Sequence, residues 1–393
     1  MSNFDLIIIG GSFAGMTSAL TLSLISEDLK IAVIEKQDIR NEDKSCDGRA
    51  YAISSYSLNL FKEIGIFDEL QQYAGIISDI KITDQNSPFF LDFIGCEVDP
   101  KNGQLGQIIE NHHIHTALRN RLFQQKNVTV FCPNFYQKIE FLDESVLVEL
   151  DDKSAIRGKL LLACDGRFSK LRDLYQIHTT KKNYHQKAIV FSISHEKSHQ
   201  NIAYEKFLPG GPLAILPFQN LHHSSIVWIA KSEVAEAILD LDETNFRQQL
   251  EKKMENVLGR INVNSEKFSY PLSLIEANKF YHEKMLLIGD AACGVHPIAG
   301  QGFNLAIAGI KILRDLIRDR LICGLDISSK AMIEEYHKKA KLNAGKMLVA
   351  TDVLNSFFET KSLSVGLLRD FGLGVVNKIP RLKNFFIKSA GGF

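Results

Sequence analysis

A stretch in the last third of the sequence, from Gly289-Asp290 to Gly302-Phe303-Asn304, combines residue types that can hold a large polar cofactor. The apolar run Met285 to Ile288 precedes it, and an apolar-periodic stretch begins near Asn304. We therefore expect a strand, a carboxylate at its end, a glycine-rich loop and the start of a helix. A carboxylate can accept hydrogen bonds from sugar hydroxyls, and free N–H groups at a helix N-terminus attract electron-rich groups. The segment predicts part of a cofactor site.

A second candidate site lies close to the N-terminus. The apolar run Leu6 to Ile9 is followed by Gly10-Gly11-Ser12-Phe13-Ala14-Gly15, a stretch with helical spacing, a second apolar run from Ile31 to Ile34, and Glu35. This order is typical of a βαβ unit in which the helix N-terminus binds a pyrophosphate and the acid binds ribose hydroxyls. Ser12 stands where a second glycine is usual. The pattern predicts a dinucleotide site without separating NAD from FAD.

A third turn of the same kind favours FAD. Another apolar run, Leu160 to Cys164, ends in Asp165-Gly166-Arg167-Phe168-Ser169-Lys170-Leu171-Arg172. An NAD dehydrogenase needs no further strand with an acidic turn at its end, whereas a cofactor that extends across the sheet edge does.

Together the three motifs resemble those of the flavoprotein aromatic hydroxylases, which carry a GxGxxG, an Asp-Gly-x-x-Ser-x-x-Arg and a Gly-Asp motif. The resemblance is closer to the ubiquinone-biosynthesis hydroxylases, through Asp47-Gly48-Arg49-Ala50, the run Pro209 to Pro217, and Asn377 to Lys383 followed by Ala390-Gly391. It covers the chain from residue 4 to its last residues. Two positions depart from the family: Cys293 replaces a usual histidine, and Gly309 replaces a usual acid.

This resemblance implies roles for individual residues around FAD. Gly10, Ser12, Ala14 and Gly15 would hold the pyrophosphate. Glu35 would hold the adenosine ribose, Arg49 the phosphate side, and Asp290 the ribityl chain. Asn111 would contact the flavin, although a helix-capping role fits this residue equally well. Further cofactor-binding residues implied in the same way are Phe13, Lys36, Asp165, Gly166, Arg172, Gly289, Gly302, Phe303 and Asn304.

The resemblance also implies the chemistry. NAD(P)H would reduce the flavin, and O2 would then form a C4a-hydroperoxide that transfers oxygen to an electron-rich phenol ring. Pro297, Gly300, Gln301 and Gly302 form the expected catalytic loop against the flavin ring, where N–H groups at the helix start would stabilise negative charge. We expect no metal. The histidines His112, His113, His115, His222 and His223 are interpreted as solvated loop residues.

These motifs predict an α/β (α+β) fold with three parts. An FAD-binding, Rossmann-like doubly wound domain of the aromatic-hydroxylase type would comprise residues 1–75, 101–182 and 276–345. A substrate domain with an inserted antiparallel sheet would comprise residues 76–100 and 183–275. Residues 346–393 would form a helical C-terminus. Phe207, Phe218 and Trp228 are candidates for the substrate pocket, with core packing as the alternative.

The composition limits the partners and the location. Lys plus Arg and Asp plus Glu number 46 each, so no global field would attract nucleic acid. No Cys-x-x-Cys pair, secretion signal or long apolar run occurs, which favours reduced thiols in the cytoplasm. From Lys361 onward basic and apolar residues alternate. This tail fits either a peripheral contact with the inner membrane or a helical subdomain packed on the protein.

The leading hypothesis is an FAD-dependent, NAD(P)H-using monooxygenase that hydroxylates the ring of a polyprenylated phenol in ubiquinone biosynthesis. A flavin reductase acting on a prenyl chain is one alternative. A flavin-binding structural subunit of a quinone-biosynthesis complex is another. The sequence leaves open the ring carbon, the choice of NADH or NADPH, the residue that activates the phenol, and the oligomeric state.

Overall fold

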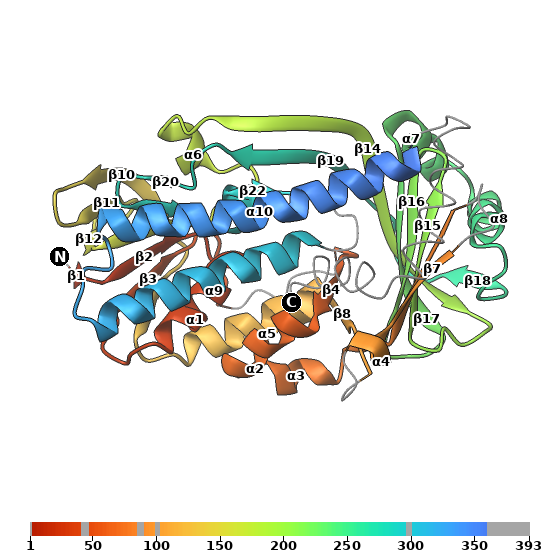
Figure 1. Cartoon of the computed structure of the whole chain (residues 1–393), viewed down its shortest axis with the longest axis horizontal. Helices are drawn as coiled ribbons and strands as arrows, with labels where there is room; N and C mark the ends of the chain where they lie inside the picture. Colours follow the sequence, from red (N-terminus) through yellow and green to blue (C-terminus); the bar gives the residue numbers. More distant parts are fainter. Residues whose placement is uncertain (1, 41–46, 85–89, 99–102, 296–300, 360–393) are drawn as a thin grey trace.

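A parallel sheet forms the base of the first part of the molecule (Figure 1). The computed structural model describes residues 2–40, 47–84, 90–98, 103–295 and 301–359. The sheet has the order β20-β21-β13-β2-β3-β9, and only the β20–β21 pair is antiparallel. Its strands are β2 (Leu6–Ile9), β3 (Ile31–Ile34), β9 (Val128–Phe131), β13 (Leu160–Ala163), β20 (Tyr281–His282) and β21 (Met285–Leu287). The central strands are continuous apolar runs because both faces of the sheet are covered.

Helices cover one face of this sheet and a second sheet covers the other. Ile8 points toward α1 (Phe13–Ser23), since an added Cβ on Gly15 of that helix would lie 3.4 Å from the Ile8 Cγ2 atom. Its neighbour Ile7 points the opposite way, toward Gly158, where an added Cβ would lie 2.7 Å from the Ile7 Cγ1 atom. Gly158 belongs to the four-stranded sheet of β1 (Ser2–Asn3), β12 (Ala155–Gly158), β11 (Val146–Leu150) and β10 (Tyr136–Phe141).

Helices α5 and α9 pack against α1, and α2 and α10 pack against α9. In Figure 1, α5 and α9 lie beside α1, and α10 runs above α9. The bounds of the helices in this part are α2 (Ser55–Glu63), α3 (Phe67–Gln71), α5 (Asn111–Phe123), α6 (Lys170–Leu174), α9 (Gln301–Ile322) and α10 (Lys330–Glu359). A small antiparallel sheet with the order β4-β8-β5 joins this part to the rest; its strands are β4 (Ala50–Ser54), β8 (Gly106–Glu110) and β5 (Gly75–Ile77).

The second part is a nine-stranded sheet with the order β22-β19-β14-β17-β16-β15-β6-β7, in which β18 also pairs with β14. Its strands are β6 (Asp79–Asp84), β7 (Phe90–Ile94), β14 (Thr179–His195), β15 (Ile202–Leu208), β16 (Gly211–Pro217), β17 (His223–Lys231), β18 (Ile261–Val263), β19 (Phe268–Ala277) and β22 (Cys293–Gly294). The antiparallel β14–β17–β16 core matches the predicted sheet. The sequence had not indicated that β15 pairs in parallel with β6.

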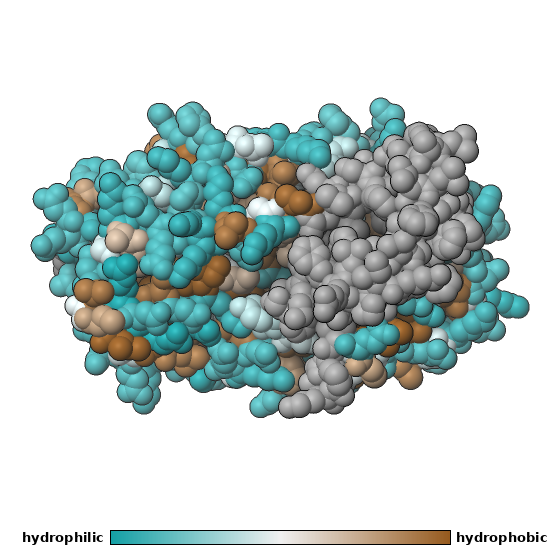
Figure 2. Space-filling view, viewed as in Figure 1, coloured by the Kyte–Doolittle hydropathy of each residue, from teal (hydrophilic) through white to brown (hydrophobic). Residues whose placement is uncertain are grey.

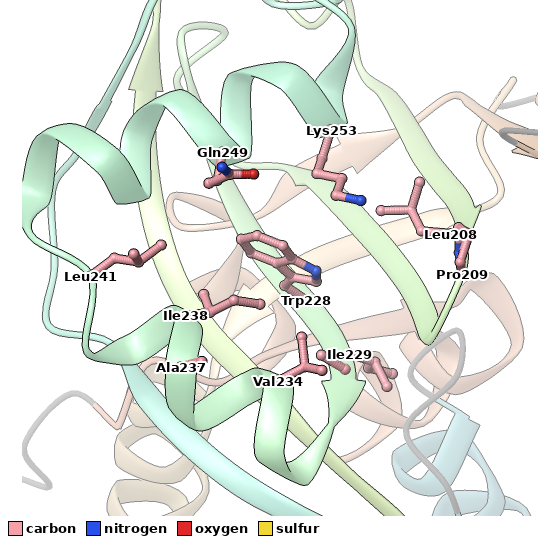
Figure 3. A pocket seen from close by; sticks show the side chains of 11 residues that line it. Leu208, Pro209, Trp228, Ile229, Val234, Ala237, Ile238, Leu241, Gln249 and Lys253 are labelled. Carbon is pink, nitrogen blue, oxygen red and sulfur yellow. The ribbon is translucent and has the colours of Figure 1, made fainter.

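Helices α7 (Ser232–Leu239) and α8 (Glu243–Met254) cover the outer face of this sheet, and α4 (Gly95–Val98) follows β7. Trp228 packs in the core beneath α7 and α8, with its ring centroid 6.2 Å from that of Phe246. It lines a cavity of about 300 Å³ between the sheet and these two helices (Figure 3). The core alternative therefore holds for Trp228, which does not face the predicted FAD-binding part.

Strand β14 runs along both parts of the protein. Its first residues, 179–183, pair only with β19, and its pairing with β17 begins at Gln186. Between Asn183 and Lys187 the register with β19 shifts, and His185 has a φ of +53°. This interruption is a bulge that bends a long strand locally.

The predicted domain boundaries remain predictions, and four of them fall within elements. The boundary at 75/76 lies in β5, that at 182/183 in β14, that at 275/276 in β19, and that at 345/346 in α10. Helix α10 continues to Glu359, and the tail from residue 361 lies outside the described residues. Among the residues that are described, no helix combines the length and apolarity needed to cross a membrane.

The face that carries α9 and α10 is largely hydrophilic, with hydrophobic residues between the polar ones (Figure 2). The exposed hydrophobic residues of these two helices and their connection are Leu321, Ile322, Leu325, Leu342 and Val349. Leu321, Ile322 and Leu325 lie close together at the end of α9, whereas Leu342 and Val349 are separate side chains of α10.

Asn127 fixes the connection between α1 and β3. Its amide nitrogen donates to the carbonyls of Ser23, Ser26 and Leu29, at 3.0, 3.0 and 3.1 Å. We predict that Asn127→Ala lowers the free energy of unfolding by about 1–2 kcal/mol, because three carbonyls lose the Asn127 donor and the Ser26 carbonyl keeps its bond from the Leu29 N–H. Urea denaturation measures this change. Asn120→Ala, which removes two exposed bonds, one to Glu69 at 3.4 Å and one from Arg119 at 3.3 Å, should change stability by less than about 0.5 kcal/mol. Equal effects in both variants would contradict the role assigned to Asn127.

Candidate active site

The three predicted turns meet at the carboxyl end of the parallel sheet. Gly10 has a φ of +104°, and an added Cβ would lie 2.5 Å from the Cys164 carbonyl oxygen. Gly289 has a φ of +61°, and an added Cβ would lie 3.1 Å from the Ala14 Cβ. Glycine is required at both positions because the backbones of neighbouring turns are in contact. The predicted convergence of the three motifs therefore occurs in the structure.

The N-terminus of α1 has no side-chain cap. Ser12 is the N-cap residue with extended backbone angles, but its exposed side chain accepts no capping hydrogen bond. Gly15 packs so closely on the Gly10 carbonyl that a side chain there would collide with it. The N–H groups of the first turn are thus presented without a side-chain cap, in the arrangement that binds phosphate groups.

Glu35 lies beside this turn, at the end of β3. Its Oε2 atom accepts a 2.6 Å hydrogen bond from the Gly11 N–H, and its Oε1 atom accepts one from the Gln37 N–H at 2.9 Å. Lys36 follows it and is exposed. The carboxylate is therefore held where the acid of a dinucleotide-binding βαβ unit contacts the ribose.

Asp165 has one carboxylate oxygen without a partner. The Leu171 N–H donates to Oδ2 at 3.1 Å, whereas Oδ1 is buried and makes no hydrogen bond within the described residues. Beside it, Gly166 has a φ of +82° and open space around it. Buried polar atoms in native proteins are nearly always hydrogen-bonded. The unpaired oxygen therefore indicates a ligand, and it supports the fit of a polar cofactor to these turns.

Arg172 connects the second turn to the third. The side chain is 1% exposed, and its two terminal nitrogens donate to the carbonyls of Ala291 and Arg167 at 3.1 and 3.0 Å. Ala291 closes the 3-10 turn Gly289–Ala291. Arg172 thus positions Asp165 relative to Asp290, and its predicted direct contact with the cofactor stays a prediction.

Arg167 is a site residue that the motifs did not single out. Its Nε lies 3.6 Å from Oδ2 of Asp290, and its terminal nitrogens donate to the carbonyls of Ser273 and Val295. Burial raises the pKa of Asp290, while the positive charge of Arg167 acts in the opposite direction. Arg167 occupies a variable position of its motif, so only its charge and its place beside Gly166 could have drawn attention to it.

A polar cluster lies where the two parts of the protein meet. Nε of Arg49 donates to Asp47 Oδ2 at 2.8 Å, and the Asn111 amide donates to the same oxygen at 2.9 Å. The Tyr270 hydroxyl of β19 donates to the Asp47 carbonyl at 2.7 Å. Burial alone would raise the pKa of Asp47, but its hydrogen bonds with Arg49 hold the pKa below its usual value. Because Glu110 is the N-cap of α5, Asn111 is not a helix cap.

The start of α9 is fixed by Phe303 and Asn304. The Phe303 ring stacks between Phe13 and Tyr51, with centroid distances of 3.8 and 4.6 Å. The Asn304 side chain donates to the Ala52 carbonyl at 2.9 Å and accepts from the Ser54 N–H at 3.1 Å. Both side chains therefore position the helix N-terminus, and their predicted cofactor contacts remain predictions.

The predicted catalytic loop is described only in part. Gln301 and Gly302 are the first residues of α9, so their backbone lies at the helix N-terminus as expected. Pro297 and Gly300 lie outside the described residues.

The two departures from the family are packing positions. Burial raises the pKa of Cys293 to about 12, so this thiol stays protonated at neutral pH. Gly309 lies in α9 where an added Cβ would be 3.7 Å from the hydroxyl of Tyr336 in α10. That hydroxyl donates to the Leu287 carbonyl at 3.2 Å. Within the described structure, both residues face neighbouring elements of the core.

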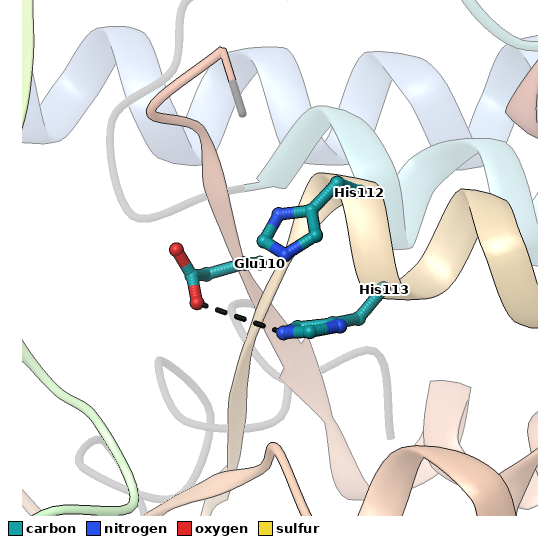
Figure 4. Close-up of side chains that lie close together, drawn as sticks. All are labelled: Glu110, His112 and His113. Atoms are coloured by element: carbon teal, nitrogen blue, oxygen red, sulfur yellow. Dashed lines mark ion pairs between the residues drawn. The ribbon is translucent and has the colours of Figure 1, made fainter. Parts of the chain in front are cut away.

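The histidine interpretation needs correction, because His112, His113 and His115 lie in α5 and not in a loop. His112 and His113 approach Glu110, and potential metal-ligand atoms of the three residues lie within 4.8 Å of one another (Figure 4). Glu110 Oε2 is 3.9 Å from His113 Nε2, and the His113 ring also stacks on Tyr73 at 3.6 Å. Burial lowers the pKa of His113 to about 4, with a smaller effect of His112. The three residues could hold a metal ion.

Comparison with known proteins places these features in a family. The family described as FAD binding domain matches residues 3–350. The ubiquinone hydroxylase UbiL of Rhodospirillum rubrum is 32% identical over 389 residues, which cover 99% of this chain and 89% of the relative. The human ubiquinone biosynthesis monooxygenase COQ6 is 27% identical, with 97% and 91% of the two chains covered.

Solved structures share the fold at low sequence identity. The p-nitrophenol 4-monooxygenase PnpA of Pseudomonas putida has a TM-score of 0.78 at 15% identity, with 100% and 99% of the two chains covered. PqsL of Pseudomonas aeruginosa, a probable FAD-dependent monooxygenase, has a TM-score of 0.79 at 16% identity, with 95% and 100% covered. The predicted fold of the aromatic-hydroxylase type is confirmed. The chain therefore belongs to the FAD-binding domain family, and within it to the flavoproteins related to the ubiquinone-biosynthesis hydroxylases, as its motifs predicted.

Proposed function

We propose that this protein is an FAD-dependent monooxygenase that hydroxylates the aromatic ring of a polyprenylated phenol in ubiquinone biosynthesis, with NAD(P)H as reductant. The observation that carries the proposal is the meeting of three glycine turns around the unpaired Oδ1 atom of Asp165. Relatives named as ubiquinone hydroxylases align with almost the whole chain. Bound FAD, once reduced, supplies the activation of O2, and the protein supplies orientation and electrostatics.

Different residues of the site bind different parts of the cofactor. The open N-terminus of α1 binds the pyrophosphate, Glu35 the ribose, and Asp290 the ribityl chain. The N–H groups at the start of α9 would stabilise negative charge on the reduced flavin. Arg167 holds Asp290 in place and moderates its pKa. The reduction of the flavin and the hydroxylation that follows both depend on this alignment of the cofactor.

We further propose that the protein works in the cytoplasm at the inner membrane, where a prenylated substrate is stored. The basic and apolar residues from Lys361 onward support a peripheral contact or docking into a quinone-biosynthesis complex.

Hydroxylation itself can be tested directly. The purified FAD-loaded protein should convert a short-chain prenylated phenol, with NADH or NADPH and isotopically labelled O2, to a product that carries one labelled oxygen on its ring. Mass spectrometry of the product detects the label. Saturation of the prenyl chain without added oxygen would instead identify a reductase. Oxidation of NAD(P)H that yields only hydrogen peroxide with every phenol tried would contradict the proposed function.

The assignment of Glu35 predicts a selective loss of FAD affinity. Replacing Glu35 by Gln removes a charged acceptor for two ribose hydroxyls, so the Kd for FAD should rise about tenfold or more. Titration of the apoprotein by flavin fluorescence measures this Kd. Glu149→Gln, at an exposed position of β11, is the matched control and should leave it unchanged. A Glu35→Gln variant that binds FAD as tightly as the natural protein would refute the ribose contact.

A further inference from the structure

The sheet of the second part has two distinct faces. On β15, Tyr204 and Leu208 pack in the core beneath α7 and α8, and Lys206 between them pairs with Glu255 at 2.8 Å. Since side chains alternate along a strand, Ala203, Glu205 and Phe207 point to the opposite face. Ala203 packs there with Ala50 and Ala52 of β4, so this inner face is the one turned toward the FAD-binding part.

A row of side chains crosses this inner face. The strand registers pair Val190 with Val227, Val227 with Ala214, Ala214 with Glu205, and Glu205 with Ile82. Four of these five side chains are apolar, and the only polar one is Glu205.

One end of the row adjoins the polar cluster beside the cofactor site. An added Cβ on Gly48 would lie 3.4 Å from the Val190 carbonyl oxygen, and Gly48 stands between Asp47 and Arg49. Glu205 is three strands away from Val190, a distance of about 14 Å at ordinary strand spacing. The row therefore extends from the edge of the cofactor site to a carboxyl group across a distance that suits an aromatic ring with substituents.

Glu205 itself is unusual in its surroundings. Its side chain is partly accessible, yet it makes no hydrogen bond or ion pair within the described residues. Burial raises its pKa to about 7, and no neighbouring charge contributes to this shift. Two charged residues are close to Glu205 in the chain or the sheet: Lys206 follows it in the sequence, and Lys81 lies on the neighbouring strand β6. Both project to the other face. An unpaired carboxyl in apolar surroundings is costly to keep unless a ligand uses it.

We propose that Glu205 is the residue that binds the ring hydroxyl of the aromatic substrate and takes its proton. The inference rests on the proposed function and names the phenol-activating group that the sequence left open. In this step the phenol O–H bond breaks, the proton passes to the Glu205 carboxylate, and the electron pair stays on the phenol oxygen. The ring becomes more electron-rich and more reactive toward electrophilic oxygen. The carboxyl then returns its proton to the product or to solvent.

Binding of a phenol and of its methyl ether separates this role from general packing. With the oxidised FAD-loaded protein, the affinity for a short-chain prenylated phenol should rise about tenfold between about pH 5 and about pH 8, as Glu205 ionises and becomes a charged acceptor. The methyl ether has no proton to donate, so its affinity should not change. Perturbation of the flavin absorption spectrum reports both affinities without turnover.

Substitution of Glu205 should remove this pH dependence. In Glu205→Gln the phenol should bind with the same affinity across this range, and kcat for hydroxylation should fall about a hundredfold. Glu205→Asp should restore part of the pH dependence. The matched control is Glu236→Gln on α7, which removes a carboxylate partner of Lys187 on the outer side and should behave like the natural protein. If Glu205→Gln keeps both the pH dependence and kcat, the proposal is overturned.

Thermal stability tests the buried state of the carboxyl independently of catalysis. The pKa of about 7 in the folded state exceeds the unfolded value of about 4.3. The contribution of the protonated carboxyl to stability is therefore fully present below about pH 4.3, and the free energy of unfolding decreases as the pH rises through 7. Glu205→Gln should therefore melt above the natural protein at about pH 8 and close to it at about pH 4. Equal melting temperatures at both pH values would contradict the placement of Glu205.

These readouts also separate the two proposals. A natural protein that binds phenols in a Glu205-dependent way but hydroxylates none of them would refute the proposed function and leave the recognition of the hydroxyl standing. Hydroxylation that is unaffected in Glu205→Gln would refute the role of Glu205 and leave the proposed function standing.

Discussion

The close approach of three backbone turns at one edge of the parallel sheet is the constraint on which the rest of the structure depends. Gly10, Gly15 and Gly289 leave no room for side chains, so α1 and the 3-10 turn of residues 289–291 can reach the ends of the strands. The approach exposes helix N–H groups and carboxylates to one space. A cofactor with a pyrophosphate and two sugar-like chains is the kind of molecule that matches both.

Buried polar side chains stabilise this arrangement of the turns. Arg172 joins two of the turns from a fully buried position, and Asn304 ties the start of α9 to β4. Both side chains use these bonds to fix backbone groups of neighbouring turns and strands. Their loss would leave buried carbonyls unpaired, so the geometry of the site and the stability of the fold rest on the same bonds.

The sequence predicts the turns and central strands well because both arise from local rules. Strands such as Leu6–Ile9 and Leu160–Ala163 are apolar runs since they are buried on both faces, and Gly10 and Gly289 adopt backbone angles that favour glycine. Contacts between distant segments could not be predicted. Asn304 meets Ser54 across 250 residues, and the face on which Trp228 lies depends on strand register. Arg167 was missed because its importance comes from Asp290, a residue in another motif.

The bulge in β14 has a mechanical consequence. The strand is hydrogen-bonded to β19 on both sides of the interruption, but only its second half belongs to the ladder with β17. Any rocking of the nine-stranded sheet over the parallel sheet would therefore concentrate at residues 184 and 185, which have no ladder partner and of which His185 has a positive φ. One continuous strand thus both links the two parts and contains the point at which its own pairing is interrupted.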